Sequence, residues 1–533
     1  MHGNRTLFAL LLVTLSPLFS AEADATRSTK ANPTQAAPNA KYINVIDKYN
    51  FRAKGQVDLI TTFSITTPGS YYLTENIGYQ GRNTSLTANL DADPVVSACA
   101  IYVDSSDVVI DLGNYTLYNN SGATLTSNQT GIIIAPSKYN VVVRNGNITG
   151  FQDTGILVRT NCDDVRMQNL TITQCVKNGI YLDGDADANA TTQNMITNCI
   201  IENSMVGRSK GLTGTDAVGL RMDNCINILV NDSAFNRCDT GTVQTVDAYG
   251  ALITSCTNVV FTNCDASGNH GKSGAGFTVE TNSSACSFIN CTANGNWGAG
   301  TTGDRFGQGF AAVSVNGCLW ENCTANANQG NAVGYGFALN TAKYCKTTKC
   351  ESSYNNAGSA ANIAGGGGRS FYSISGEGNI WDECEAIGSQ ISLSAITAAE
   401  CIGFDLQTET HSIIQNCISR NQNSNSNAAW GIGINLYNTD RCVIDNCSIT
   451  HNRSATQNQG IGLLDNKGAN SSALVTRCFF FNNGDEVAPN TAQNFHLDYN
   501  PGEFNITTTV NQGSMGSLTG INPYQNVSLE VIG

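Results

Sequence analysis

The chain has 533 residues, a formal net charge of −14 and only 13% charged residues, with 53 glycines and 20 cysteines. This acidic balance, without a cluster of basic residues, argues against nucleic acid or an anionic membrane surface as a partner. The length alone would indicate several globular domains, but a repeated pattern favours one continuous stacked core.

The N-terminus has the pattern of an export signal. An apolar run over residues 7–19 is too short to span a bilayer comfortably, and residues 21–23 or 23–25 offer a small-x-small cleavage site. We therefore expect residues 1–25 to be a signal peptide and the mature chain to have no transmembrane segment. The polar, proline-containing residues 26–41 are expected to form a flexible linker. The expected location is extracellular or at the cell surface, with the periplasm as the alternative.

The remaining chain repeats a short pattern in which an asparagine precedes a cysteine or stands at the equivalent position. Between Asn145 and Asn322 this marker recurs every 24 to 33 residues. The asparagines assigned to it are Asn145, Asn169, Asn198, Asn231, Asn263, Asn290, Asn322, Asn416 and Asn446, and the same register falls on Lys349, Glu383 and Arg477.

A glycine that opens a short apolar strand recurs in step with these asparagines, as in residues 155–158 and 276–279. Coils of this length, with short strands and no helical periodicity, predict a parallel β-solenoid. Asparagine tolerates left-handed backbone angles, so one per coil can turn the chain, and amides stacked about 4.8 Å apart can hydrogen-bond to one another. We expect this ladder to be buried, which would close the glycosylation sequons at Asn290 and Asn322.

The asparagine ladder at a tight turn, with glycine-led first strands, resembles the right-handed parallel β-helix of the pectate-lyase-like superfamily. The resemblance covers residues 95–500 and implies an all-β, single-stranded right-handed parallel β-helix, a solenoid of about thirteen coils. Residues 42–94 would then be an N-terminal cap, and residues 501–533 a C-terminal cap or tail.

The cysteines allow more than one interpretation. Twenty cysteines in an exported chain suggest disulfides, but cysteines stacked in neighbouring coils have parallel Cβ vectors, which is a poor geometry for a bridge. Mostly reduced, buried ladders are therefore favoured. The alternative keeps some bridges, for example from Cys99 or Cys238 to a loop partner. A zinc site is disfavoured because there is no CxxC pair and histidine is scarce.

The resemblance implies that function lies on the outer face of each coil's first strand. Outward positions there would place Asp183 and Asp223 about 5 Å apart, with Arg221 on the same strand as Asp223 and Asp216 on an adjoining loop. By analogy with Ca²⁺-dependent lyases, Asp183, Asp216 and Asp223 are candidate Ca²⁺ ligands. Asp183, Arg221 and Asp223 are the candidate catalytic residues, with Arg221 as the base for β-elimination. Asp183 and Asp223 could instead be a glycosidase pair, or simply polar residues that face water.

A second group of side chains combines one aromatic ring with charges of both signs on loops of successive coils. Such a group suits a sugar, which stacks one face on the ring and is hydrogen-bonded at its edge, although ordinary solvated loops would look the same. The candidate substrate-binding residues are Asp247, His270, Lys272, Trp297, Asp304 and Arg305.

Two functions stay open at this point. The catalytic motifs of the glycosidase and epimerase branches of the fold are absent or in the wrong order, and only 5 histidines are present. We therefore favour a secreted or surface-exposed protein that binds carbohydrate along its first-strand face without catalysis, as an adhesin or surface protein. The alternative is a Ca²⁺-dependent, polysaccharide lyase-like or other carbohydrate-active enzyme. Either function predicts a polysaccharide or cell-surface glycan as the partner.

Overall fold

The computed structural model describes most of the chain beyond residue 42, and every element in the described part is a β-strand. The predicted signal peptide and linker lie outside the described residues. No helix in this part is long and apolar enough to cross a membrane. The described ranges are residues 43–46, 62–79, 99–120, 129–184, 195–211, 214–241, 245–300, 306–357, 367–391, 400–424, 430–454, 460–466, 473–481, 483–485, 493–498, 504–512 and 527–531.

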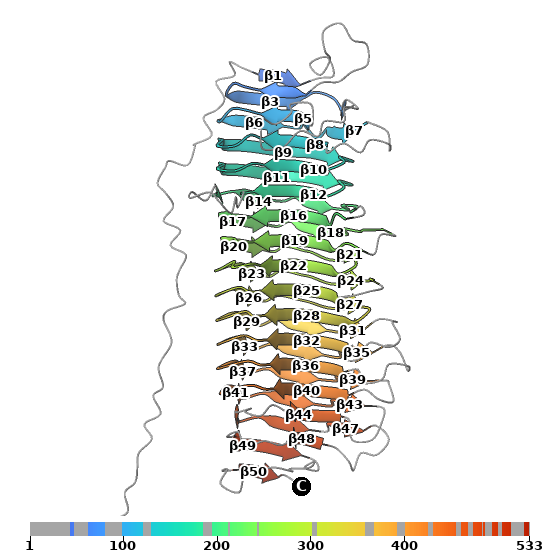
Figure 1. Cartoon of the computed structure of the whole chain (residues 1–533), viewed down its shortest axis with the longest axis vertical. Helices are drawn as coiled ribbons and strands as arrows, with labels where there is room; N and C mark the ends of the chain where they lie inside the picture. Colours follow the sequence, from blue (N-terminus) through green and yellow to red (C-terminus); the bar gives the residue numbers. More distant parts are fainter. Residues whose placement is uncertain are drawn as a thin grey trace, which may run out of the picture. The chain divides into compact units, whose positions relative to one another are not determined.

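The strands form three parallel sheets, and each coil places one strand above the corresponding strand of the next coil (Figure 1). The first sheet has fifteen strands, which differs slightly from the thirteen predicted coils. These strands are β2 (Phe63–Ile65), β5 (Cys99–Val103), β8 (Thr130–Ile134), β10 (Thr154–Val158), β12 (Asn178–Asp183), β16 (Ala217–Asp223), β19 (Ala248–Thr254), β22 (Gly274–Glu280), β25 (Phe306–Val313), β28 (Val333–Asn340), β32 (Gly367–Ile374), β36 (Glu400–Gln407), β40 (Trp430–Tyr437), β44 (Gly460–Asn466) and β48 (Gln493–Asp498).

The second sheet contains the strands before and after the asparagine turn of each coil. Some of its strands continue through that turn without interruption. Its strands are β1 (Ile43–Ile46), β3 (Gly69–Leu73), β4 (Ile77–Tyr79), β6 (Val108–Asp111), β7 (Thr116–Asn119), β9 (Tyr139–Thr149), β11 (Asp163–Thr173), β13 (Ile196–Thr197), β14 (Ile200–Glu202), β15 (Met205–Gly207), β17 (Cys225–Asn231), β18 (Ala234–Asn236), β20 (Thr257–Thr262), β23 (Ser287–Ile289), β26 (Leu319–Glu321), β29 (Lys346–Thr348), β30 (Glu351–Ser353), β33 (Ile380–Asp382), β34 (Glu385–Ile387), β37 (Ile413–Gln415), β38 (Ile418–Arg420), β41 (Cys442–Asp445), β42 (Ser448–Thr450), β45 (Ala473–Thr476), β46 (Phe479–Phe481), β49 (Phe504–Gln512) and β50 (Val527–Val531).

The third sheet consists of two-residue strands that precede the return to the first sheet. They are β21 (His270–Gly271), β24 (Trp297–Gly298), β27 (Gln329–Gly330), β31 (Asn356–Ala357), β35 (Gln390–Ile391), β39 (Asn423–Ser424), β43 (Arg453–Ser454) and β47 (Gly484–Asp485).

One residue per coil turns the chain within the second sheet in the left-handed conformation, as the repeat predicts. Asn263, Asn290 and Asn322 have φ values of 53°, 53° and 51°. The amide of Asn290 donates to Asn263 Oδ1 at 3.2 Å. Lys349 and Glu383 also adopt φ values of 53°, so the backbone keeps the turn even where the side chain does not favour it.

Two asparagines assigned to this ladder were placed wrongly. Asn231 is the last residue of β17, and Asp232 takes the left-handed turn with φ of 47° while accepting a 3.0 Å hydrogen bond from Asn263. Asn198 turns the chain at an earlier bend, where the Asn227 amide donates to it, and Asn203 stands in the ladder instead. Aspartate tolerates the left-handed region almost as well as asparagine, so the residue type alone did not fix the register.

The ladder is also exposed rather than buried, contrary to the prediction. Asn290 and Asn322 are exposed, whereas the following Cys291 and Cys323 are buried. The left-handed bend lies at a corner of the coil, so its side chain points to solvent while the next one returns to the core. The glycosylation sequons at Asn290 and Asn322 are therefore not made inaccessible by burial.

A second amide ladder, which the repeat analysis missed, is fully buried before the third sheet. Asn269, Asn296, Asn328 and Asn355 are 0% exposed. The backbone N–H of each of the first three donates to the side-chain oxygen of the next at 3.0–3.1 Å. These hydrogen bonds satisfy backbone groups that would otherwise be buried without partners.

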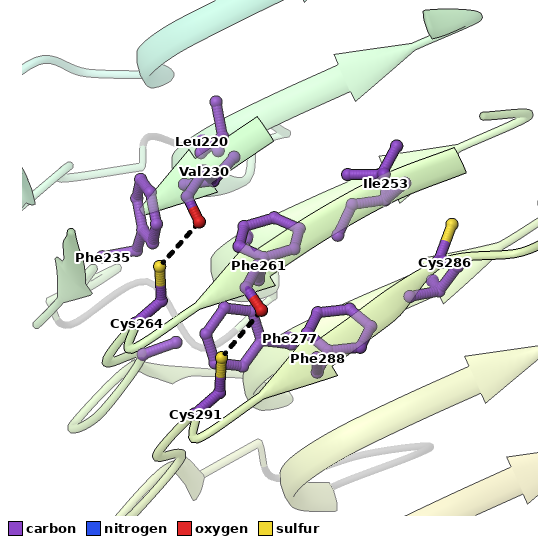
Figure 2. Close-up of a cluster of buried hydrophobic side chains, with 14 of the residues drawn as sticks. Leu220, Val230, Phe235, Ile253, Phe261, Cys264, Phe277, Cys286, Phe288 and Cys291 are labelled. Atoms are coloured by element: carbon purple, nitrogen blue, oxygen red, sulfur yellow. Dashed lines mark hydrogen bonds between the residues drawn. The ribbon is translucent and has the colours of Figure 1, made fainter. Parts of the chain in front are cut away.

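Aromatic rings stacked in register fill the middle of the core. Phe277 and Phe310 are stacked with ring centroids 5.2 Å apart, and Phe310 and Phe337 follow at 4.9 Å. Phe261 and Phe288 of the second sheet form a parallel stack beside Phe277 (Figure 2). Because one coil's ring lies directly on the next, the same apolar positions must recur in every coil.

All 20 cysteines are free and buried. Figure 2 shows Cys264 and Cys291 on successive coils, where their thiols donate to the carbonyl oxygens of Val230 and Phe261 at 3.5 and 3.6 Å. Burial raises the pKa of Cys175 and Cys238 to about 12. Neutral, hydrogen-bonded thiols of this kind act as small apolar fillers.

This arrangement predicts that reagents in solution cannot reach the cysteine thiols of the folded protein. A thiol reagent such as DTNB should modify close to none of the 20 cysteines under native conditions and all 20 after denaturation without reductant. A shortfall in the denatured count would reveal disulfides and contradict the reduced ladders.

Candidate functional site

The outer face of the first sheet carries a group of half-buried polar side chains between β10 and β22, which we call the polar strip. On β22 the side chains of Phe277 and Val279 enter the core, so Thr278 and Glu280 face outward. The same alternation on the neighbouring strands and loops defines the strip, whose members are Arg159, Tyr181, Asp183, Asp216, Arg221, Asp223, Asp247, Tyr249, Thr254 and Glu280.

The predicted residues Asp183, Arg221 and Asp223 do meet in this strip. Asp183 and Asp223 are partners in the β12–β16 register. The Tyr181 hydroxyl lies 2.7 Å from Asp223 Oδ2 and 3.1 Å from Asp183 Oδ1, so one phenol links both carboxylates. Arg221 Nε donates to Asp223 Oδ2 at 2.9 Å, and Arg159 forms a 3.0 Å ion pair with Asp183.

These pairs limit the chemistry open to Arg221. Burial lowers its pKa, but the charge of Asp223 and the neighbouring groups outweigh that effect, and the net shift is upward. The deprotonated guanidinium that a base for β-elimination needs is therefore disfavoured. The geometry suits Arg221 as a donor that holds Asp223 and contacts a ligand, and its predicted catalytic role stays a prediction.

Asp216 and Asp247 extend the strip along the loops. The backbone N–H of Asp247 donates to Asp216 Oδ1 at 2.9 Å, and the N–H of Ser273 donates to Asp247 Oδ1 at 2.9 Å. Burial raises the pKa of Asp216, and the charge of Asp247 adds to the shift. Lys272, next to Ser273, opposes that shift and brings a positive charge to this end of the strip.

Between β10 and β22, two polar side-chain atoms of the outer face have no hydrogen-bond partner among the described residues. They are the second carboxylate oxygen of Asp223, Oδ1, and the hydroxyl of Thr278, and both are buried. A buried polar group without a partner costs about 1–3 kcal/mol. Because both atoms are buried, a bound molecule cannot reach them in this arrangement.

The expected Ca²⁺ ligands only partly suit the ion. Carboxylate oxygens are the right chemistry, but Ca²⁺ takes six to eight oxygens. Asp183 is engaged by Arg159 and Tyr181, and one oxygen of Asp223 by Arg221. In the described ranges, no three acidic, histidine or cysteine side chains form one group that could hold a metal. Calcium binding therefore stays a prediction.

The second predicted group lies beside the strip on the third sheet. His270 and Trp297 are register partners whose rings stack at 4.4 Å and 4°, and Trp297 is 42% exposed. His270 Nδ1 also lies 3.3 Å from Asp239. Asp247 and Lys272 adjoin this pair through the loop before β22. Asp304 and Arg305 fall outside the described residues.

Farther along the same face, a buried cluster escaped the sequence reasoning. Arg369 Nε lies 3.0 Å from Asp405, and its guanidinium lies over the ring of Tyr372. Asp405 is 0% exposed although its position faces outward, and Tyr335 is also buried. In the sequence, the only indication of this cluster was the alternation of inward and outward residues along β32 and β36.

Glu280, a member of the polar strip, makes the free energy of unfolding depend on pH. Burial raises its pKa above the unfolded value of 4.5, so folding disfavours the carboxylate. This penalty is absent below about pH 4.5 and grows as pH rises through the folded pKa. We expect Glu280→Gln to raise the melting temperature at about pH 7 and to have no effect near pH 4.

The matched control is Glu321→Gln on β26 of the second sheet, away from the strip. A lower melting temperature for Glu280→Gln at neutral pH would show that the carboxylate stabilises the fold instead.

A match to a family model agrees with the coil architecture. Residues 81–247 match the family model described as a right handed beta helix region. No curated protein matches the sequence.

Similar solved structures include the periplasmic alginate epimerase AlgG, at 10% identity over 65% of this chain and 76% of that chain with a TM-score of 0.45. Pectate lyase Pel9A is 15% identical over 62% and 79%, with a TM-score of 0.32. Gene product 12 of bacteriophage phi29, in its pre-mature form, is 11% identical over 85% and 59%, with a TM-score of 0.46. The protein is an all-β, right-handed parallel β-helix, the fold that the resemblance to the pectate-lyase-like superfamily predicted.

Proposed function

We propose that this protein binds a polysaccharide or cell-surface glycan along the polar strip and the adjoining His270–Trp297 pair. The observation that carries the proposal is the exposed indole of Trp297, which is stacked on His270 of a strand that leads into Lys272 and into the loop that holds the Asp247 carboxylate. Sugar sites combine these two elements, because an aromatic surface contacts the C–H groups while planar polar side chains bind the hydroxyls.

The two parts of this surface are connected through the backbone. His270 is followed by Gly271 and Lys272, and the N–H of Lys272 donates to Val246 O at 2.7 Å. The next N–H, of Ser273, fixes the Asp247 carboxylate. A chain of sugars that extends from the indole toward the polar strip would pass the loop that carries Lys272 and Asp247.

The preferred biological role is that of an exported adhesin or surface protein, as the N-terminal pattern suggests. The ion pairs of Asp183 with Arg159 and of Asp223 with Arg221 support binding, because they hold these side chains in fixed positions for a ligand. The enzyme alternative differs only in whether the bound glycan is cut.

Removing the indole should weaken glycan binding. We expect Trp297→Ala to raise the dissociation constant about tenfold, equivalent to about 1.4 kcal/mol, because the lost stacking surface is not replaced. Binding would be measured by calorimetry against a panel of neutral, acidic and host-type glycans. Tyr354→Ala is the matched control, because Tyr354 is 57% exposed at the bend between β30 and β31, two coils away from Trp297.

Equal losses in the two variants would mean that exposed aromatics matter only nonspecifically. No measurable binding by the folded wild-type chain to any glycan of the panel would overturn the proposal.

A further inference from the structure

The outer face of the second sheet carries two rows of side chains with opposite character. On β20, Val259 and Phe261 are buried, so Val260 and Thr262 face outward. Phe261 contacts Phe277 of the first sheet, with ring centroids 5.3 Å apart (Figure 2). The outer faces of the two sheets therefore look away from each other, and this surface is separate from the polar strip.

The row that contains Val260 is apolar along almost its whole length, and we call it the apolar row. Its strands stack on one another (Figure 1), and the row keeps one register from Val109 on β6 to Leu474 on β45. Within that range, only Arg166, Ser287 and Lys346 interrupt it. The apolar members between the ends include Ile200, Leu229, Val260, Ile380, Ile413 and Val443. These side chains are half-buried, and Leu474 is 39% exposed.

The next row on the same strands, which we call the polar row, shows that strand conformation alone does not explain this composition. It lies two residues farther along each strand, from Asp111 to Thr476, and also faces outward. Except for Ile289, its members are polar or charged. The preference of apolar residues for strands acts equally on both rows. A contiguous apolar surface with a polar edge instead marks an interaction site.

The size of this surface matches what a stable protein–protein interface needs. At the ~4.8 Å spacing of paired strands, the apolar row from β6 to β45 is about 58 Å long. With half of the space to the rows on either side it is about 7 Å wide, and with those rows partly included it is about 14 Å wide. The face therefore covers about 800 Å², the area that each partner of a standard interface buries.

The period of the row points to a second copy of this chain as the partner. A partner that covers the whole row needs side chains that repeat every ~4.8 Å over the same length. A helix, whose turns repeat every ~5.4 Å, would fall out of step with the row within a few coils. Another copy has the matching period by construction, and two such sheets can pack face to face about 10 Å apart.

The acids beside the apolar row favour a parallel pair over an antiparallel one. The polar row carries Glu202, Glu321, Asp382 and Asp445. In an antiparallel pair, this row of one copy would lie against the same row of the other, which opposes like charges. A two-fold axis along the stack of coils places the two acidic rows at opposite edges of the interface, so they do not meet.

We propose that two copies of this chain associate along the apolar row as a parallel, two-fold symmetric dimer. The interface is isologous, so each member of the apolar row faces the same residue of the other copy. The polar strip stays open in this dimer, because it lies across the core on the first sheet. The association is therefore independent of the proposed glycan binding.

The first test measures the mass of the full mature chain by sedimentation equilibrium from nanomolar to micromolar concentrations. We expect a reversible dimer. Val260→Lys should raise its dissociation constant at least about tenfold, because the new ammonium would be buried without a partner. Thr262→Lys is the matched control, since Thr262 is an outward β-branched residue of the same strand, in the polar row. Its effect should be smaller.

A gain of association guards against a variant that simply folds poorly. Ser287→Val fills an interruption of the apolar row and should lower the dissociation constant. Melting temperatures of all variants would show that the fold is kept. A monomer at every concentration, or equal weakening by Val260→Lys and Thr262→Lys, would overturn the proposed interface.

Cross-linking tests the orientation, because all 20 native cysteines are buried and a new surface cysteine reacts alone. Ile200→Cys and Leu474→Cys lie toward opposite ends of the apolar row. In a parallel dimer, a short bifunctional thiol reagent should link each variant to its own copy, whereas Thr262→Cys should not be linked. A dimer in which neither end is linked would overturn the parallel arrangement.

Discussion

The strict parallel register between coils is the constraint on which the rest of this structure depends. Each strand pairs with the equivalent strand of the next coil, so each side chain lies directly above the side chain at the same position of the neighbouring coil. This repetition stacks Phe277 on Phe310 in the core and places Asp223, Thr254 and Glu280 in one outward row. One left-handed residue per coil maintains the register, because an extra residue in a strand would move its side chains to the opposite face.

The fold could be predicted because the sequence repeats what the register requires. Inward cysteines and phenylalanines, glycine-led strands and one turn-forming residue per coil all recur at the spacing of a solenoid. The errors at Asn198 and Asn231 have one physical cause. Several bends in each coil use left-handed asparagine or aspartate, so identity alone cannot assign a residue to one bend. The exposure of the ladder could not be read from the residue type either.

The site was predicted less completely. Alternation along β12 and β16 correctly brought Asp183, Arg221 and Asp223 to one face, because it needs only the strand period. It could not show that Arg159 and Arg221 neutralise those acids, since that pairing depends on side-chain rotamers. Tyr181 and Thr278 were missed for the same reason. An outward tyrosine or threonine looks unremarkable until a neighbouring coil supplies, or fails to supply, its hydrogen-bond partner.

The central claim is that a glycan lies along the polar strip and the adjoining His270–Trp297 pair. Hydroxyl-radical footprinting with mass spectrometry, with and without a bound glycan from the panel, tests it most directly. The account predicts protection of Trp297 and Tyr249, while the exposed Tyr354 and Tyr437 are oxidised equally in both samples. Protection confined to the outer surface of the second sheet, with Trp297 unchanged, would contradict it.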